Sequence, residues 1–84
     1  MTEYIISVTG IISPGYINWM KAKYYYSHAD MTDNIITFEE IKSFENNICA
    51  IMYAKELYND MIFKSILITV RTLSDDNLVY NCKR

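Results

Sequence analysis

The sequence predicts an α+β domain in which a four-stranded antiparallel sheet carries one helix on one face. Segments of alternating side chains near both ends of the chain predict strands, and a segment of helical periodicity lies between them. Turn-forming residues separate these segments. We expect the order β-β-α-β-β within a single domain over residues 1–84, because a chain of 84 residues is large enough for only one hydrophobic core.

The first two strands are expected in the N-terminal third of the chain. Residues 4–9 alternate with the period of two that is typical of a strand with one buried face. Gly10 interrupts this pattern, and Pro14-Gly15 suits a type II turn because Pro restricts φ and Gly accepts a positive φ. Residues 16–27, which are rich in Tyr, Trp and Ile, are expected to return beside the first strand.

The helix is expected over residues 37–59. Thr37 and Glu40 have the spacing of a capping box, in which each side chain bonds the backbone N–H of the other residue. One apolar stripe is expected to pack on the sheet: Ile41, Phe44, Ile48, Ile51, Met52 and Tyr58. A second strip is expected to point away from the first and to be covered by a loop, a second copy or a partner: Cys49, Ala50, Tyr53 and Leu57.

The last two strands are expected to form a hairpin. Residues 63–72 alternate between the two faces of a strand, and residues 74–77 have the Ser, Asp and Asn content of a turn. Residues 78–82 would then complete the hairpin. The sheet face away from the helix is left either solvated or covered by a partner.

The composition disfavours several classes of function. The chain has 8 Lys and Arg against 10 Asp and Glu, without the basic excess that draws a domain to nucleic acid. It contains 2 Cys without a Cys-x-x-Cys spacing and 1 His, so we expect reduced thiols, no disulfide and no metal site. We find no nucleophile motif and no phosphate-binding glycine loop, and therefore expect no enzyme activity, no catalytic residue and no cofactor.

The N-terminal residues lack the basic start and apolar block of a secretory signal. The longest uninterrupted apolar run, residues 48–54, is far shorter than the roughly 20 residues that a membrane span needs. We therefore expect a soluble, cytoplasmic protein without a membrane partner.

Aromatic residues are concentrated in residues 15–28, which hold the only Trp of the chain. Tyr and Trp present a large apolar area with a polar tip and few rotatable bonds, as binding surfaces require. If this stretch is a strand, alternation separates one set of side chains onto one face. The partner-binding residues predicted from this set and from the second helical strip are Trp19, Lys21, Lys23, Tyr25, Tyr53 and Leu57.

An alternative function uses the same strand. Trp19 and Tyr25 would stack on the bases of a single-stranded nucleic acid, while Lys21 and Lys23 would meet its phosphates. The net charge of −2 and the absence of the common RNA-recognition signature disfavour this alternative. Binding to a protein is therefore the leading hypothesis.

In its size, its richness in Ile, Asn, Tyr and Lys, and its expected β-β-α-β-β order, the chain resembles small accessory proteins of tailed bacteriophages. The resemblance covers the whole chain and carries over no functional residue. It implies a protein that acts stoichiometrically on a host enzyme, toxin or defence component, in the host cytoplasm. We accordingly expect a non-enzymatic homodimer that binds and inhibits or redirects a host protein.

Overall fold

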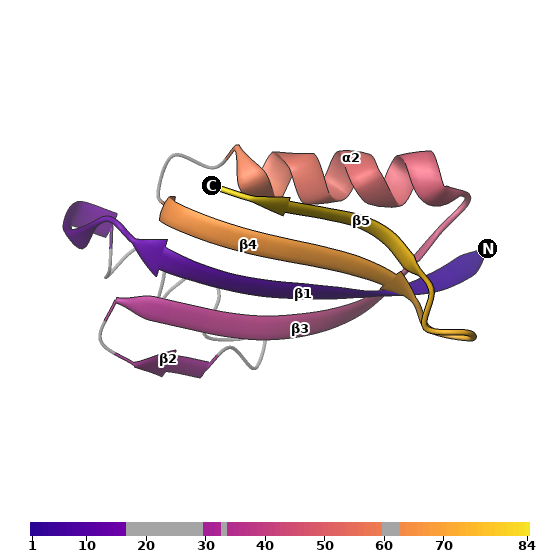
Figure 1. Ribbon diagram of the computed structural model, residues 1–84, viewed down its shortest axis with the longest axis horizontal. Helices are drawn as coiled ribbons and strands as arrows, with labels where there is room; N and C mark the ends of the chain where they lie inside the picture. Colours follow the sequence, from indigo (N-terminus) through magenta and orange to yellow (C-terminus); the bar gives the residue numbers. More distant parts are fainter. Residues whose placement is uncertain (17–29, 33, 60–62) are drawn as a thin grey trace.

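In the described residues, the strands form one antiparallel sheet and the helix α2 lies against one of its faces (Figure 1). The structure is a computed structural model that describes residues 1–16, 30–32, 34–59 and 63–84. The elements follow along the chain as β1 (Thr2–Ile12), the 3-10 turn η1 (Pro14–Tyr16), β2 (Asp30–Thr32), β3 (Ile35–Phe44), α2 (Asn47–Tyr58), β4 (Phe63–Thr72) and β5 (Leu78–Lys83).

β1 is the central strand of the sheet, whose order is β2-β3-β1-β4-β5. β1 pairs antiparallel with β3 on one side and with β4 on the other, so β3 and β4 run in the same direction. A connection between two parallel strands must return along the sheet, and α2 provides this return on the side of β4 and β5 (Figure 1). The C-terminal hairpin then places β5 at one edge of the sheet.

The predicted fold class is confirmed. β1, β3, β4 and β5, together with α2, follow the order β-β-α-β-β, and the sheet is antiparallel throughout its pairings. The short strand β2 adds three residues beside the first part of β3. The predicted C-terminal hairpin is also confirmed, with residues 73–77 connecting β4 to β5.

The expected start of the helix is wrong. Thr37 and Glu40, the proposed capping box, lie inside β3, where every residue has a partner in β1. The ladder satisfies the backbone groups of this segment, so a cap is not needed there. α2 begins ten residues later, after Asn46, whose side-chain Oδ1 accepts a hydrogen bond from the N–H of Cys49 at 3.0 Å.

The expected second strand begins in a different conformation. Tyr16 belongs to η1, and residues 17–29, which contain the rest of that predicted strand, lie outside the described residues. The predicted type II turn at Pro14-Gly15 is wrong, because neither described glycine has a positive φ. Instead, β1 continues through Gly10 to Ile12, and the strand that pairs with it along nearly its whole length is β3.

Gly10 serves close packing instead of ending β1. A Cβ atom at this position would lie 2.6 Å from Cδ1 of Phe63, which is closer than two non-bonded carbon atoms can approach. The Phe63 ring therefore rests directly on the backbone of β1. No signal in the sequence distinguishes this use of a strand glycine from a strand end.

The hydrophobic core lies between the sheet and α2. Alternate residues of β1, β3 and β4 point to the helix, and all buried side chains among the described residues are hydrophobic. These buried residues are Tyr4, Ile6, Val8, Ile12, Ile36, Phe38, Ala50, Ala54, Phe63, Ile66, Ile68 and Val70. Ala50 and Ala54 are the helix residues of this set, and their small side chains allow α2 to approach the sheet closely.

The predicted orientation of the helix is wrong for most of its residues, although Tyr58 of the predicted sheet-facing stripe does pack against the core. Ile48 and Met52, assigned to the sheet-facing stripe, are 68% and 61% exposed. Tyr53 and Leu57, assigned to the outer strip, pack against the core next to Ala54. Apolar residues occur on both sides of α2, so periodicity alone did not indicate which side the sheet covers.

Candidate functional site

The sheet face opposite α2 carries an unusual number of exposed apolar side chains. This open face consists of the odd-numbered residues of β1 from Glu3 to Ile11, of β3 from Ile35 to Ser43, and of β4 from Ser65 to Arg71. Its apolar members are Ile5, Ile11, Ile35, Ile41 and Leu67. Sheets in two-layer domains usually present polar residues to water on this side, so the open face is the first candidate for an interaction surface.

The strand register gathers these apolar residues into pairs. Ile5 lies directly opposite Ile41, and Ile11 lies directly opposite Ile35. Ile11, Ile35 and Ile41 are 37%, 45% and 58% exposed, respectively, and Leu67 is 43% exposed. Directly opposite residues of an antiparallel pair are in contact distance, so each end of the face presents a continuous apolar area.

A polar centre separates the two apolar ends of the open face. The Ser7 hydroxyl donates a hydrogen bond to Oε2 of Glu39 at 3.1 Å, and a guanidinium nitrogen of Arg71 lies 4.0 Å from the same oxygen. Thr9 and Thr37 lie opposite each other in the next row. Protein–protein interfaces usually combine an apolar centre with a polar rim, so this face contains both kinds of group in the reverse arrangement.

The turn between β4 and β5 is held by its own side chains at the border of the open face. Asp75 accepts hydrogen bonds from the hydroxyl of Thr72 and from Nδ2 of Asn77, the latter at 2.8 Å. Chiefly because of the Thr72 hydrogen bond, the pKa of the Asp75 carboxyl lies below its usual value. Arg71 contacts Asp76 at 2.9 Å, which ties the turn to the polar centre of the face.

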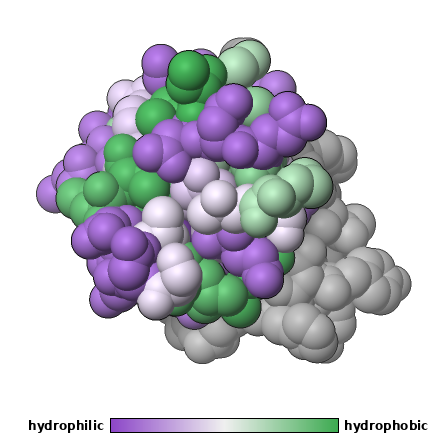
Figure 2. Space-filling model, turned by 90° about the vertical axis from the view of Figure 1, so that its right-hand side faces the viewer, coloured by the Kyte–Doolittle hydropathy of each residue, from purple (hydrophilic) through white to green (hydrophobic). Residues whose placement is uncertain are grey.

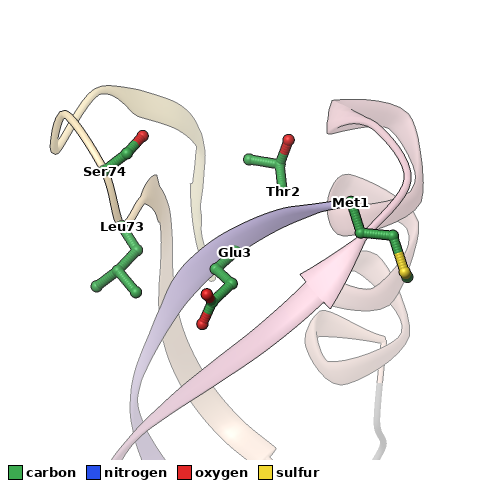
Figure 3. A pocket seen from close by; sticks show the side chains of 5 residues that line it. All are labelled: Met1, Thr2, Glu3, Leu73 and Ser74. Atoms are coloured by element: carbon green, nitrogen blue, oxygen red, sulfur yellow. The ribbon is translucent and has the colours of Figure 1, made fainter.

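A shallow hollow lies beside the start of β1, and Figure 3 shows the five side chains that surround it. It has a volume of about 300 Å³ and is lined by Met1, Thr2, Glu3, Leu73 and Ser74. All five residues are exposed, and Glu3 has the single ionisable side chain of the lining. The hollow therefore lacks the enclosure and the convergent polar groups of a ligand pocket.

The end of the molecule near this hollow carries scattered apolar residues. Figure 2 views this end and shows green apolar areas separated by purple polar ones. Isolated exposed apolar side chains are normal on protein surfaces, whereas contiguous ones mark interaction sites. The paired residues of the open face therefore make a stronger candidate than this end.

The structure places only part of the predicted site. Trp19, Lys21, Lys23 and Tyr25 lie outside the described residues, so their assigned role stays a prediction. Tyr53 and Leu57 are described, but they lie on the sheet side of α2, and the prediction that this strip points away from the sheet is wrong.

Tyr53 is held among the side chains of β3. Its hydroxyl donates a hydrogen bond to Oε2 of Glu40 at 2.5 Å, and its ring centroid lies 4.6 Å from Nζ of Lys42. The ring also packs against Phe44, with 5.6 Å between centroids. These contacts give Tyr53 a structural role in fastening α2 to β3.

The open-face apolar residues were missed, although the sequence contains a signal for them. Ile5-Ile6, Ile11-Ile12, Ile35-Ile36 and Leu67-Ile68 are apolar doublets. Consecutive residues of a strand point to opposite faces, so each doublet supplies one side chain to the core and one to the open face. The doublets thus indicate a sheet with apolar residues on both faces.

No group of three or more His, Cys, Asp or Glu side chains suited to a metal ion occurs in the described part of the chain. Cys49 and Cys82 are free thiols. Within the same residues, no helix is long and apolar enough to cross a membrane.

No family model matches the chain, and no curated protein or solved structure shows significant similarity to it. The class of the protein therefore follows from its fold and surface. It is a two-layer α+β domain with one buried hydrophobic core and an open sheet face that carries exposed apolar residues around a polar centre.

Proposed function

We propose that this chain is a non-enzymatic protein that binds another protein through its open sheet face and thereby inhibits or redirects it. The observation that carries this proposal is the pairing of exposed apolar residues, Ile11 with Ile35 and Ile5 with Ile41, around a polar centre. Contiguous apolar residues on an exposed face tend to mark sites where a partner removes them from water.

The chemistry of the open face defines the kind of partner that it fits. A surface with apolar ends fits a partner with matching apolar side chains, and the Ser7, Glu39 and Arg71 group offers both acceptors and donors in between. The resemblance to small accessory proteins of tailed bacteriophages supports a host enzyme, toxin or defence component as this partner. Action in the host cytoplasm and a dimeric state belong to the same proposal.

Affinity capture from a lysate of the host cell, with mass spectrometry, tests the proposal when it compares matched variants. Leu67→Lys places a charge in the open face, whereas Met52→Lys places the same charge on the exposed outer side of α2. We expect a protein partner that the wild type and Met52→Lys retain and that Leu67→Lys loses. Capture of no protein, or equal capture by both variants, would contradict the proposal.

The nucleic-acid alternative rests on Trp19, Lys21, Lys23 and Tyr25, and a salt titration separates it from protein binding. Affinity for a single-stranded oligonucleotide must fall steeply with salt if phosphate contacts drive it, whereas an apolar protein interface changes little. Trp19→Ala should weaken stacking on the oligonucleotide if this alternative holds. Binding of a protein partner that is insensitive to salt and to nuclease treatment would decide for the leading proposal.

A further inference from the structure

The outer edge of β3 is the longest strand edge that the described residues leave without a neighbouring strand. β2 pairs with β3 only at Ile35, Ile36 and Thr37. Over the remaining residues of β3, from Phe38 to Phe44, the described part of the chain supplies a partner on the β1 side alone. An edge of this kind presents a row of backbone N–H and C=O groups to which another strand can pair.

This edge is also regular, unlike the other edge of the sheet. The pairing of β3 with β1 proceeds without a register shift from Thr2–Phe44 to Ile11–Ile35. β5 forms the opposite edge, and its pairing with β4 shifts register between Val70 and Arg71. Bulges twist an edge away from further pairing, so β3 is the better edge for strand addition.

The sequence of the β3 edge is complementary to itself. If two copies pair antiparallel around a two-fold axis at Ile41, Glu40 lies opposite Lys42 of the second copy, and Lys42 opposite its Glu40. Opposite charges that face each other directly across two strands stabilise the pairing. β5 offers no such charge match, since it carries Lys83 but no acidic residue.

The charged side chains of this edge are already positioned. Tyr53 holds the Glu40 carboxylate by a hydrogen bond of 2.5 Å and lies under the Lys42 ammonium at 4.6 Å. Both side chains therefore lie on the helix side of β3, near its edge, before any partner arrives. Ordering them in a dimer interface requires little additional loss of side-chain freedom.

We propose that two copies of the chain associate through antiparallel pairing of their β3 edges, with Ile41 on the two-fold axis. This inference rests on the dimeric part of the proposed function and adds the interface. Directly paired residues share a face of the sheet, so the two open faces become one continuous surface with both α2 helices on the other side. The exposed Ile41 side chains meet at its centre.

Two charge variants and their mixture test the interface. Glu40→Lys sets Lys opposite Lys in a homodimer, and Lys42→Glu sets Glu opposite Glu, so each variant alone should dimerise about tenfold to a hundredfold more weakly than the wild type. In a mixture of the two, every charge faces its opposite. We expect light scattering to show twice the mass of 9.9 kDa for the wild type and for the mixture, with lower masses for each variant alone.

Glu40→Gln is the matched control, because it removes the charge but keeps an acceptor for the Tyr53 hydroxyl. It should dimerise with intermediate strength, and circular dichroism should show that all variants keep the wild-type fold. A wild type that stays monomeric over a concentration series overturns the proposal, whatever segment or molecule covers β3. Wild-type dimers whose strength all these variants leave unchanged overturn it too, since the interface then lies elsewhere.

Failure of the β3 interface remains distinguishable from failure of the proposed partner binding. Leu67→Lys alters the open face without changing the β3 edge, and Glu40→Lys alters the edge while Leu67 stays in place. If the wild type is monomeric and captures a partner that Leu67→Lys loses, the open face is supported and the β3 dimer is rejected. If the wild type dimerises through β3 but captures no protein, the dimer is supported and the proposed partner binding is rejected.

Discussion

The two faces of the sheet differ although the same strands build both. On the helix face, directly paired residues such as Val8 and Ile68 are buried and apolar, and the polar residues Glu40 and Lys42 lie only at its β3 side. On the open face, apolar pairs alternate with hydrogen-bonded polar residues, and most of these side chains remain partly exposed. The buried helix face accounts for most of the stability, and the open face is the surface that we propose for partner binding.

The largest difference between the two faces is expected when neighbouring residues of β4 that point to opposite faces are truncated. Ile68 is fully buried, and Leu67 is 43% exposed. Ile68→Ala should lower the free energy of unfolding by about 3 kcal/mol, through lost burial and the cavity left behind. Leu67→Ala should lower it by less than about 1 kcal/mol. Denaturant unfolding measures both, and equal losses would mean that the open face is covered in solution.

Gly10 and Gly15 give a second contrast, with a smaller expected effect. Gly10→Ala forces its Cβ against the Phe63 ring at 2.6 Å, whereas a Cβ at Gly15 meets nothing within 4 Å. We expect a loss of about 1–3 kcal/mol for Gly10→Ala from overpacking and a change within about 1 kcal/mol for Gly15→Ala. Thermal unfolding of both variants measures the difference. An unchanged Gly10→Ala variant would show that the ring does not rest on β1.

The first turn of α2, on the helix face, is capped by Asn46. Asn46→Ala removes the acceptor of the Cys49 N–H and should cost about 1 kcal/mol. Asn46→Asp is the matched control, because it retains a capping oxygen and adds a charge that favours a helix N-terminus. Chemical denaturation followed by far-UV circular dichroism compares them. If both variants unfold alike, the first turn of α2 is not held by this side chain.

The smallest expected effect concerns Asp75, in the turn that borders the open face. Hydrogen bonds from Thr72, Ser74 and Asn77 lower its pKa in the folded protein, so folding favours the ionised form. The resulting stabilisation is present above the pKa of the unfolded chain and is lost as the pH falls through the lower folded pKa. Asp75→Asn should flatten this acid dependence of the melting temperature. If the melting temperatures of the wild type and Asp75→Asn change with pH in the same way, Asp75 is not the cause of the acid dependence.

Short-range patterns in the sequence predicted the C-terminal strands correctly. The alternation of residues 63–72 and the turn chemistry of residues 74–77 predicted the C-terminal hairpin, because both signals depend on neighbours in the chain. The Thr37–Glu40 spacing failed because a capping box is also compatible with the alternation of a strand. Pairing with β1 along the whole of β3 decided between these two local possibilities.

The candidate site was predicted less well than the fold. Trp19 and its neighbours stay a prediction, and the strip with Tyr53 and Leu57 faces the sheet and not away from it. The open face arises from the register that brings Ile11 beside Ile35 and Ile5 beside Ile41. These residues lie more than twenty positions apart in the sequence, so no local pattern indicates that they meet.

Local patterns in the sequence are sufficient to predict the α+β class and the order β-β-α-β-β, and the apolar doublets of the strands supply apolar residues to both faces of the sheet. These properties follow from the periods of strands and helices, which are local. Long-range packing settles which side of α2 is buried, that β1 is central, and that β2 lies beside only the first residues of the β3 edge. Each of these depends on which distant surfaces pack together to remove the most apolar area from water.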